Sequence, residues 1–483
     1  MRSALQGWIG AQARFATSRL LRAISATDLV MERRGFGQRV IPAPGSVLAS
    51  PVIAHYDPDP DYFFHWFRDS ALVIDALRVA IEAGYADAGA SVRFEEFIEF
   101  SLGLQSLDGG ELVRHAEWRS RVQPAFLQYL RPAAELAALS GSAIPADARV
   151  NPDGTLDVIR WGRPQADGPA MRALTLLRWW RQFPALWEQL TRRASAASLI
   201  HLDLQLTRAQ LQRPCSGIWE EALGHHYYTE LLQSEALSRG AEWLESTGGA
   251  ALARTVALEA ERVRAALERF WDPARGFCRS TASDSPGDTD RDLDMSALLA
   301  VLHAGRRAGP HSVLDPRAQA TLAALEELFE ARYAINRHRP ADRGPAMGRY
   351  ASDRYYSGGA WYIATLGAAE FYFQLALALR NGASLADSRE NATFRQRLGA
   401  TAADEALAHR ALERGDAFMR TVRAFTPESG ELSEQFDQTT GVQTSAKHLS
   451  WSYAAFITAA ASRALACQAI RSADPPMMAA DAD

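Results

Sequence analysis

Apolar residues recur at helical spacing through most of this chain, and that periodicity constrains the fold more than any other feature. Helices are predicted at residues 70–83, 169–193, 225–246, 250–271, 294–304, 316–334, 359–379, 402–425 and 446–473. Strand signals are scarce and short. Polar connections rich in Gly and Pro separate the helices at 42–61, 152–168, 211–217, 280–290, 336–356 and 426–443. The pattern predicts an all-α fold of helical hairpins arranged around one axis.

The composition is that of an ordinary globular enzyme with a large core. Of the 483 residues, 47% are hydrophobic and 23% are charged. The net charge of −5 argues against a surface that binds nucleic acid or an anionic membrane, because such a surface needs clustered positive charge. Cys215, Cys278 and Cys467 lie far apart, and the adjacent His225 and His226 lack metal-site spacing. We therefore expect no metal, no cofactor, and no nucleic-acid or membrane partner.

The domain organisation is expected to be simple. No Ser/Thr/Gly-rich linker divides the chain, and no β-rich segment follows the last predicted helix. We therefore expect one domain over residues 1–473 and a disordered acidic tail at 474–483. Polar residues interrupt the apolar side chains of residues 1–22, so the run required of a signal peptide is absent and a cytoplasmic location is expected.

Trp219, Glu220 and Glu221 form the first segment with candidate chemistry. A carboxyl group beside an indole ring loses solvation, which favours its protonated form and suits a proton donor. The flat indole face also suits a sugar ring. Two adjacent glutamates at a helix end are most often solvated surface, so this triplet needs a second carboxylate and a sugar-sized pocket.

Five segments combine aromatic, arginine and carboxylate residues where a connection meets a predicted helix. They are residues 62–70, 160–168, 219–221, 348–356 and 433–437. Arg and Asp side chains can form paired hydrogen bonds with neighbouring sugar hydroxyls, while Trp and Tyr faces stack on the apolar side of a sugar ring. The five segments are therefore predicted to line one pocket for an oligosaccharide or polysaccharide.

These segments, in this order, resemble glycoside hydrolase family 15, the glucoamylase family. The matching stretches read WFRDS from Trp66, WGRPQADGP from Trp161, IWEE from Ile218, GRYASDRYY from Gly348 and SEQFD from Ser433, followed by LSWSYA from Leu449. The resemblance runs from about residue 20 to about 470 and leaves no room for a starch-binding domain. It implies an (α/α)6 barrel and an inverting, exo-acting α-glucosidase that releases glucose from non-reducing ends.

The resemblance also implies residue roles, with Glu220 as general acid and Glu434 as general base. An inverting pair stands roughly 6.5 to 9.5 Å apart, so these distant residues must meet across one pocket. The implied substrate-binding residues are Tyr62, Trp66, Arg68, Asp69, Trp161, Trp219, Glu221, Arg349, Asp353, Tyr355, Trp361 and Trp451. Tyr62 is expected beside the nucleophilic water, and the tryptophans and Tyr355 form the wall. Without the resemblance, a neighbouring Arg-Asp pair such as Arg68 and Asp69 is most often a surface or structural ion pair. A tryptophan on a helix, such as Trp361 or Trp451, is most often part of the hydrophobic core.

The pattern departs from the fungal enzymes at four positions. These are His65, Gly217, Leu223 and Ser352. Because they surround the expected acid and leaving-group subsites, they leave open whether the substrate is an α-1,4-glucan or maltooligosaccharide, an isomaltose or dextran end, or trehalose. A catalytically silent sugar-binding protein is the alternative of another class, but the presence of both Glu220 and Glu434 favours an enzyme.

Overall fold

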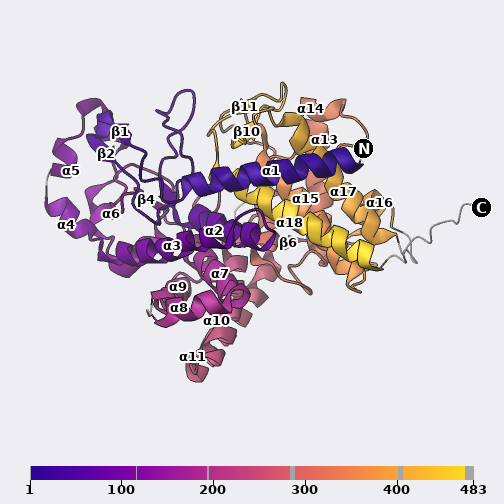
Figure 1. Ribbon diagram of the computed structural model, residues 1–483, viewed down its shortest axis with the longest axis horizontal. Coiled ribbons are helices and arrows are strands. Elements are labelled where there is room, and N and C mark those ends of the chain that lie inside the picture. The colour runs from indigo at the N-terminus through magenta and orange to yellow at the C-terminus, as the bar shows by residue number, and fades with distance from the viewer. Residues whose placement is uncertain (1, 116, 193–194, 283–288, 401–405, 474–483) are drawn as a thin grey trace, which may run out of the picture.

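The protein is mostly helical throughout the part of the chain that the computed structural model describes (Figure 1). The described residues are 2–115, 117–192, 195–282, 289–400 and 406–473. The predicted acidic tail at 474–483 lies outside these ranges.

Six helices form a closed inner ring in which each helix contacts the next. They are α2 (Phe67–Glu82), α7 (Asp167–Gln182), α10 (Tyr227–Ser246), α12 (Ser296–Ala304), α15 (Tyr362–Arg380) and α18 (Ser450–Ala473). Contact between α18 and α2 closes the ring. These helices bury side chains on nearly every side, because both the ring interior and the outer layer cover them.

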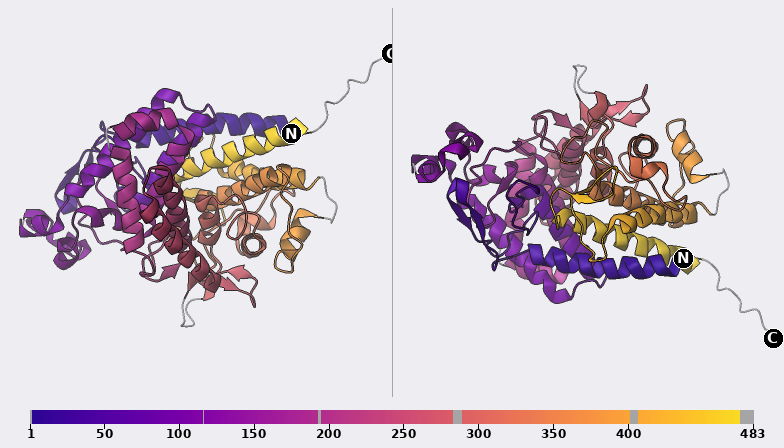
Figure 2. Two further views of the ribbon diagram at one scale, coloured as in Figure 1. Left: turned by 90° about the horizontal axis from the view of Figure 1, so that it is seen from below. Right: turned by 90° about the horizontal axis from the view of Figure 1, so that it is seen from above.

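Six further helices form the outer layer and alternate with the inner helices along the chain. They are α1 (Arg2–Ala23), α3 (Val92–Gly103), α9 (Ser195–Ala209), α11 (Ala250–Ala266), α13 (Pro316–Arg332) and α17 (Leu407–Phe425). Helix α1 packs on α18 and α2, and the two views of Figure 2 show α1 and α18 side by side. The predicted (α/α)6 barrel is confirmed.

Shorter helices fill the connections. They are α4 (Gly109–Arg114), α5 (Glu117–Ser120), α6 (Ala133–Ala137), α8 (Pro184–Arg192), α14 (Ala334–Arg337) and α16 (Ala392–Leu398). The segment 104–149 contains α4, α5 and α6 together with short 3-10 turns at Leu104–Ser106, Pro124–Tyr129 and Gly141–Ala146. Its apolar side chains pack beside the connections that lead into α2 and α7.

Every strand in the described part of the chain is two or three residues long, and all pairings are antiparallel. The pairs are β1 (Met31–Arg33) with β2 (Gln38–Val40), β3 (His65–Trp66) with β4 (Arg149–Val150), β5 (His225–His226) with β8 (Thr281–Ala282), and β6 (Trp271–Asp272) with β7 (Phe277–Cys278). A three-stranded sheet contains β9 (Ala360–Trp361), β10 (Gln435–Phe436) and β11 (Gln443–Thr444). Strands β3, β5 and β9 each lead directly into an inner helix, so they fix the loops at one end of the barrel.

The helix predicted at 169–193 is wrong as a single element. Helix α7 ends at Gln182, Phe183 leaves the helical region with φ −125° and ψ 67°, and α8 begins at Pro184. Proline disfavours helical backbone at the residue before it and lacks the N–H that would continue the ladder. Helices α1, α3 and α9 lie outside the predicted helices.

Two described helices, α15 and α18, are long and apolar enough to cross a membrane by length and composition alone. Their most apolar windows are 72% and 56% buried within the barrel. A core helix passes the same test, so this is weak evidence for a membrane span.

Candidate active site

A cavity of about 220 Å³ lies at the end of the barrel where the inner helices begin. Its wall contains every predicted catalytic and substrate-binding residue except Asp353. The members are Tyr62, Trp66, Arg68, Asp69, Trp161, Trp219, Glu220, Glu221, Arg349, Tyr355, Trp361, Glu434 and Trp451. Ala49, Gly162, Ile218 and Leu449 also line it and were not predicted, because no residue type among them signals chemistry.

Glu220 sits on a strained turn that the neighbouring loop approaches very closely. Its φ is +63°, a region that residues other than glycine seldom adopt and that is often found at functional sites. A Cβ atom at Gly162 would lie 2.1 Å from the Glu220 carbonyl oxygen. Only glycine therefore allows the loop carrying Trp161 to lie against this turn.

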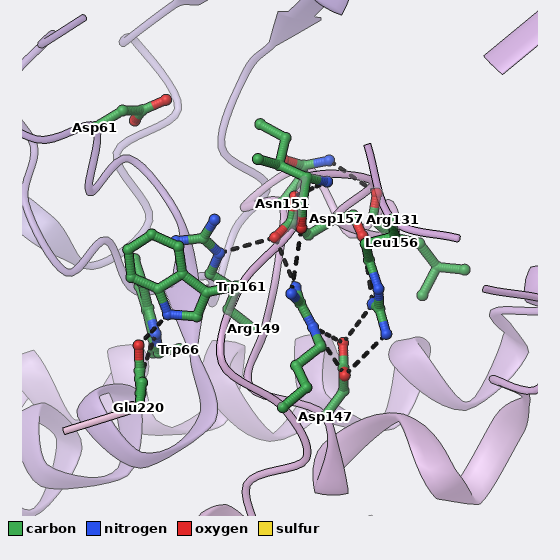
Figure 3. Close-up of polar contacts among 12 residues, drawn as sticks. Asp61, Trp66, Arg131, Asp147, Arg149, Asn151, Leu156, Asp157, Trp161 and Glu220 are labelled. Carbon is green, nitrogen blue, oxygen red and sulfur yellow. Dashed lines mark hydrogen bonds and ion pairs between the residues drawn. The ribbon is translucent and has the colours of Figure 1, made fainter. Parts of the chain in front are cut away.

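The Glu220 carboxyl group accepts hydrogen bonds from three side chains. Trp66 Nε1 donates to Oε1 at 2.9 Å and Arg68 Nη2 donates to the same oxygen at 3.2 Å. Trp161 Nε1 donates to Oε2. Figure 3 shows the indole of Trp66 beside that of Trp161, with Glu220 at their N–H edges. The two oxygens are thus held in different environments.

Arg68 is buried among three carboxylates at the start of α2. Its Nη2 lies 3.1 Å from Asp69 Oδ2, and its Nη1 lies 3.2 Å from Asp167 Oδ2. Burial raises the pKa of Asp69 to about 6, although Arg68 opposes that shift. The Arg68 guanidinium also lies 5.3 Å from the ring centre of Trp451. This cluster presents a fixed donor and a fixed acceptor to the cavity.

Glu434 is more buried than Glu220, with 4% of its surface exposed. Its backbone N–H donates to Ala446 O at 2.8 Å, directly before strand β10. Burial raises the pKa of Glu434 to about 7, against the hydrogen bond that Ser445 Oγ donates to Oε2. The hydroxyl oxygens of Tyr62 and Tyr355 lie 2.9 Å apart and share a hydrogen bond, and Tyr62 lies beside the Glu434 carboxyl group.

Glu221 and Arg349 form a second charged pair in the wall. Arg349 Nη2 lies 2.8 Å from Glu221 Oε1. Asp353 lies behind this pair rather than in the cavity: it accepts from Arg349 Nε at 2.8 Å and from Trp361 Nε1 at 3.2 Å. Asp353 is thus the predicted substrate-binding residue that the structure places outside the cavity wall, behind Arg349 and Trp361, and its contact with substrate stays a prediction.

The aromatic wall is fixed by a buried carboxylate that was not predicted. Trp219 Nε1 donates to both oxygens of Asp294 at 2.9 Å, and burial raises the pKa of Asp294 to about 6. The Trp219 ring lies 5.4 Å from that of Trp361 and 6.4 Å from that of Trp451. Asp294 sits just before α12, and no sequence motif marks it.

The four positions that depart from the fungal pattern do not line the cavity. Leu223 is 67% exposed, Gly217 has φ +65° and packs on the ring of His226, and His65 is buried with Nδ1 accepting from Val47 N. His226 Nε2 lies 3.0 Å from the carbonyl oxygens of both Cys215 and Ala222. Within the described residues, no group of three or more His, Cys, Asp or Glu is placed to hold a metal ion.

Glu434→Gln is expected to stabilise the folded protein more at pH 8 than at pH 4.5. Burial raises the pKa of Glu434 in the folded protein to about 7, so between its unfolded value and about 7 the carboxyl group is ionised in the unfolded chain and mostly protonated in the folded one. The stability of the wild type therefore falls as pH rises through this window. The gain at pH 8 is at most about 3 kcal/mol. Thermal unfolding of both proteins across pH 4.5 to 8 measures it.

Exposed Glu428 provides the matched control for this measurement. Glu428→Gln removes a carboxyl group without a buried environment and should leave the Tm difference flat over the same pH range. An equal pH dependence for the two variants would contradict the assigned environment of Glu434.

Comparison with known proteins matches this chain to one family. The model for glycosyl hydrolases family 15 matches residues 36–103 and 150–461. Glucoamylase 1 of Rhizopus oryzae is 26% identical over 448 residues, covering 88% of this chain and 68% of that protein. The intracellular sporulation-specific glucoamylase of Saccharomyces cerevisiae is 27% identical over 502 residues, covering 94% of this chain and 83% of that protein.

Solved structures give the same result. The family 15 glucoamylase from Hypocrea jecorina matches with a TM-score of 0.78 and 28% identity, covering 95% of this chain and 72% of that one. The glucoamylase from Saccharomycopsis fibuligera matches with a TM-score of 0.78 at 22% identity and covers 97% of each chain, which supports the fold alone. The chain therefore belongs to glycoside hydrolase family 15, a family of inverting glycosidases.

Proposed function

We propose that this protein is an inverting, exo-acting glucosidase that releases β-D-glucose from the non-reducing ends of α-1,4-glucans or maltooligosaccharides. The observation that carries the proposal is the convergence of Glu220 and Glu434 on one sugar-sized cavity with hydroxyl-binding Arg and Asp groups. A cavity of about 220 Å³ suits the terminal unit of a chain better than a long internal segment.

Glu220 acts as the general acid through Oε2. Its Oε1 accepts hydrogen bonds from both Trp66 and Arg68, which occupies the lone pairs of that oxygen. Oε2 accepts from Trp161 alone, so a second lone pair remains to carry the transferable proton. Transfer of that proton to the glycosidic oxygen accompanies cleavage of its bond to the anomeric carbon.

Glu434 acts as the general base. Its ionised carboxylate accepts a proton from water as the water oxygen bonds to the anomeric carbon from the side opposite the leaving group, which inverts the configuration there. Ser445 fixes one carboxylate oxygen, and the hydroxyl of Tyr62 lies beside the group. The raised pKa gives this base a greater proton affinity than an exposed carboxylate has.

Arg68, Asp69, Arg349 and Glu221 hold the sugar hydroxyls. Each is already fixed by an ion pair, so little side-chain freedom is lost on binding. The ring faces of the surrounding tryptophans cover the apolar side of the sugar. Preorganised donors and acceptors of this kind act on the transition state without further rearrangement.

Loss of each proposed catalytic group should have a different signature. Glu220→Gln is expected to reduce hydrolysis of maltose by about 10²- to 10⁴-fold while sparing α-D-glucosyl fluoride, whose fluoride leaves without protonation. Glu434→Gln should reduce turnover of both substrates. Proton NMR of the wild-type reaction should show β-glucose as the first product, and α-glucose first would exclude inversion.

Linkage preference is tested by comparing initial rates of glucose release from maltotriose, isomaltotriose and trehalose. We expect maltotriose to react fastest. A faster reaction with isomaltotriose or trehalose would contradict the α-1,4 preference and assign the enzyme to isomaltose or dextran ends, or to trehalose. Binding of these sugars without turnover of any of them would indicate a silent sugar-binding protein.

The dependence of kcat/KM on pH should report the burial of Glu434. A base with a pKa of about 7 in the free enzyme is half ionised at that pH and mostly protonated below it, so kcat/KM on maltose should fall as pH drops through about 7. Well below that point the decline should approach about tenfold per pH unit. A profile that stays flat from pH 7.5 to 5 would show that a different group acts as the base.

A further inference from the structure

A buried guanidinium lies behind the two indoles that bind Glu220. Arg149 is 1% exposed and lies on β4 directly opposite Trp66 on β3. Its Cζ atom is 4.0 Å from the ring centre of Trp161, 4.5 Å from that of Trp66 and 3.9 Å from that of Phe64. Figure 3 shows Arg149 behind the Trp161 indole, and Glu220 at the N–H edges of the two indoles.

Arg149 belongs to a network of arginines and carboxylates. Arg149 Nε donates to Asp157 Oδ2 at 2.8 Å, and Arg163 Nη2 donates to the same oxygen at 2.7 Å. Asp147 joins Arg163 to Arg131 through contacts of 2.9 Å on both sides. Three guanidiniums thus share two buried carboxylates, and the more exposed Glu135 lies 3.9 Å from Arg131 Nε.

One end of Arg149 is directed at rings instead of acceptors. Its Nη1 is buried and has no hydrogen-bond partner in the part of the chain that the structure describes. Aromatic faces are the remaining electron-rich groups around it. A guanidinium at these distances attracts an indole face through the ring quadrupole, most strongly when both are removed from water. The guanidinium therefore restrains the tilt of both indoles.

Those indoles supply two of the three hydrogen bonds that Glu220 accepts, one to each carboxylate oxygen. An indole that tilts about its side-chain torsions moves its N–H away from the oxygen, because the donor sits on the ring edge. The orientation of the carboxyl group therefore depends on a residue that does not touch it.

We infer that Arg149 is a positioning residue for the general acid: its guanidinium holds the rings of Trp66 and Trp161 so that their N–H groups orient Glu220. This inference rests on the proposed function. Arg131, Asp147 and Arg149 all lie in residues 104–149, the segment between the two ranges that the family model matches. Arg149 directly precedes the second matched range, whereas the network members Asp157 and Arg163 lie within it.

The test uses the leaving group to separate positioning of the acid from general damage. Arg149→Met keeps most of the side-chain length but removes the cation. It should lower kcat/KM on maltose by about tenfold or more, while kcat/KM on α-D-glucosyl fluoride falls less than about threefold. Arg149→Lys should restore part of the maltose activity, since it returns a positive charge near the rings.

Arg131→Met is the matched control, because Arg131 pairs with Asp147 in the same network at 4% exposure and contacts neither indole. It should not change the ratio of the two activities. Equal losses on both substrates in Arg149→Met, or the same selective loss in Arg131→Met, would overturn the inference. If Arg149→Met does not fold, the ratio measured for Arg149→Lys decides, and an unchanged ratio overturns it.

The wild-type enzyme separates this inference from the proposed function. No glucose release from either substrate by wild type would overturn the proposed function and the inference with it. Turnover by wild type with an unselective loss in the Arg149 variants would overturn the inference alone.

Discussion

The inner helices all begin at the same end of the barrel, and the active-site cavity exists because of that shared direction. Arg68 and Asp69 lie in the first turn of α2, Trp361 directly precedes α15, and Trp451 lies in the first turn of α18. The N-terminal ends of helices carry partial positive charge and unpaired N–H groups. One end of the ring therefore favours a concentration of carboxylates that would be costly at the other end.

Burial of those carboxylates requires compensation, and arginine supplies most of it. Arg68 lies among three carboxylates, and Arg349 joins Glu221 to Asp353. Glu434 differs, because burial raises its pKa to about 7 against the opposing hydrogen bonds of the Ser445 and Tyr62 hydroxyls and the charge of Arg349. The two glutamates therefore differ in their hydrogen-bond partners within one cavity: N–H groups donate to Glu220, and a serine hydroxyl donates to Glu434.

The sequence predicts all six inner helices, but only α11, α13 and α17 of the outer layer, and most of the cavity, because these parts carry local patterns. Helical periodicity persists through an inner helix such as α15, and the motifs around Arg68 and Glu220 carry their chemistry in consecutive residues. Helix starts were displaced by short strands such as β5 and β9, which form only when a distant partner strand is present. Pairing between distant segments has no local signal.

Two supporting residues that no motif marks, Arg149 and Asp294, act through the same kind of distant contact. Asp353 is predicted from its motif and is bound by the nearby Arg349, but only the assembled fold shows that it lies behind the cavity wall. Arg149 has no motif, and its position behind the indoles depends on the pairing of β3 with β4. Asp294 likewise acts through Trp219, which comes from another connection. Such supporting groups become visible only when the loops are assembled.

The central claim is that Glu220 and Glu434 flank a sugar ring as an inverting pair. A crystal structure with glucose bound tests this most directly. The account predicts a glucose ring held by Arg68 and Asp69, with roughly 6.5 to 9.5 Å between the two carboxyl groups and a water on Glu434. A separation of about 5 to 5.5 Å, or glucose bound away from these two residues, would contradict it.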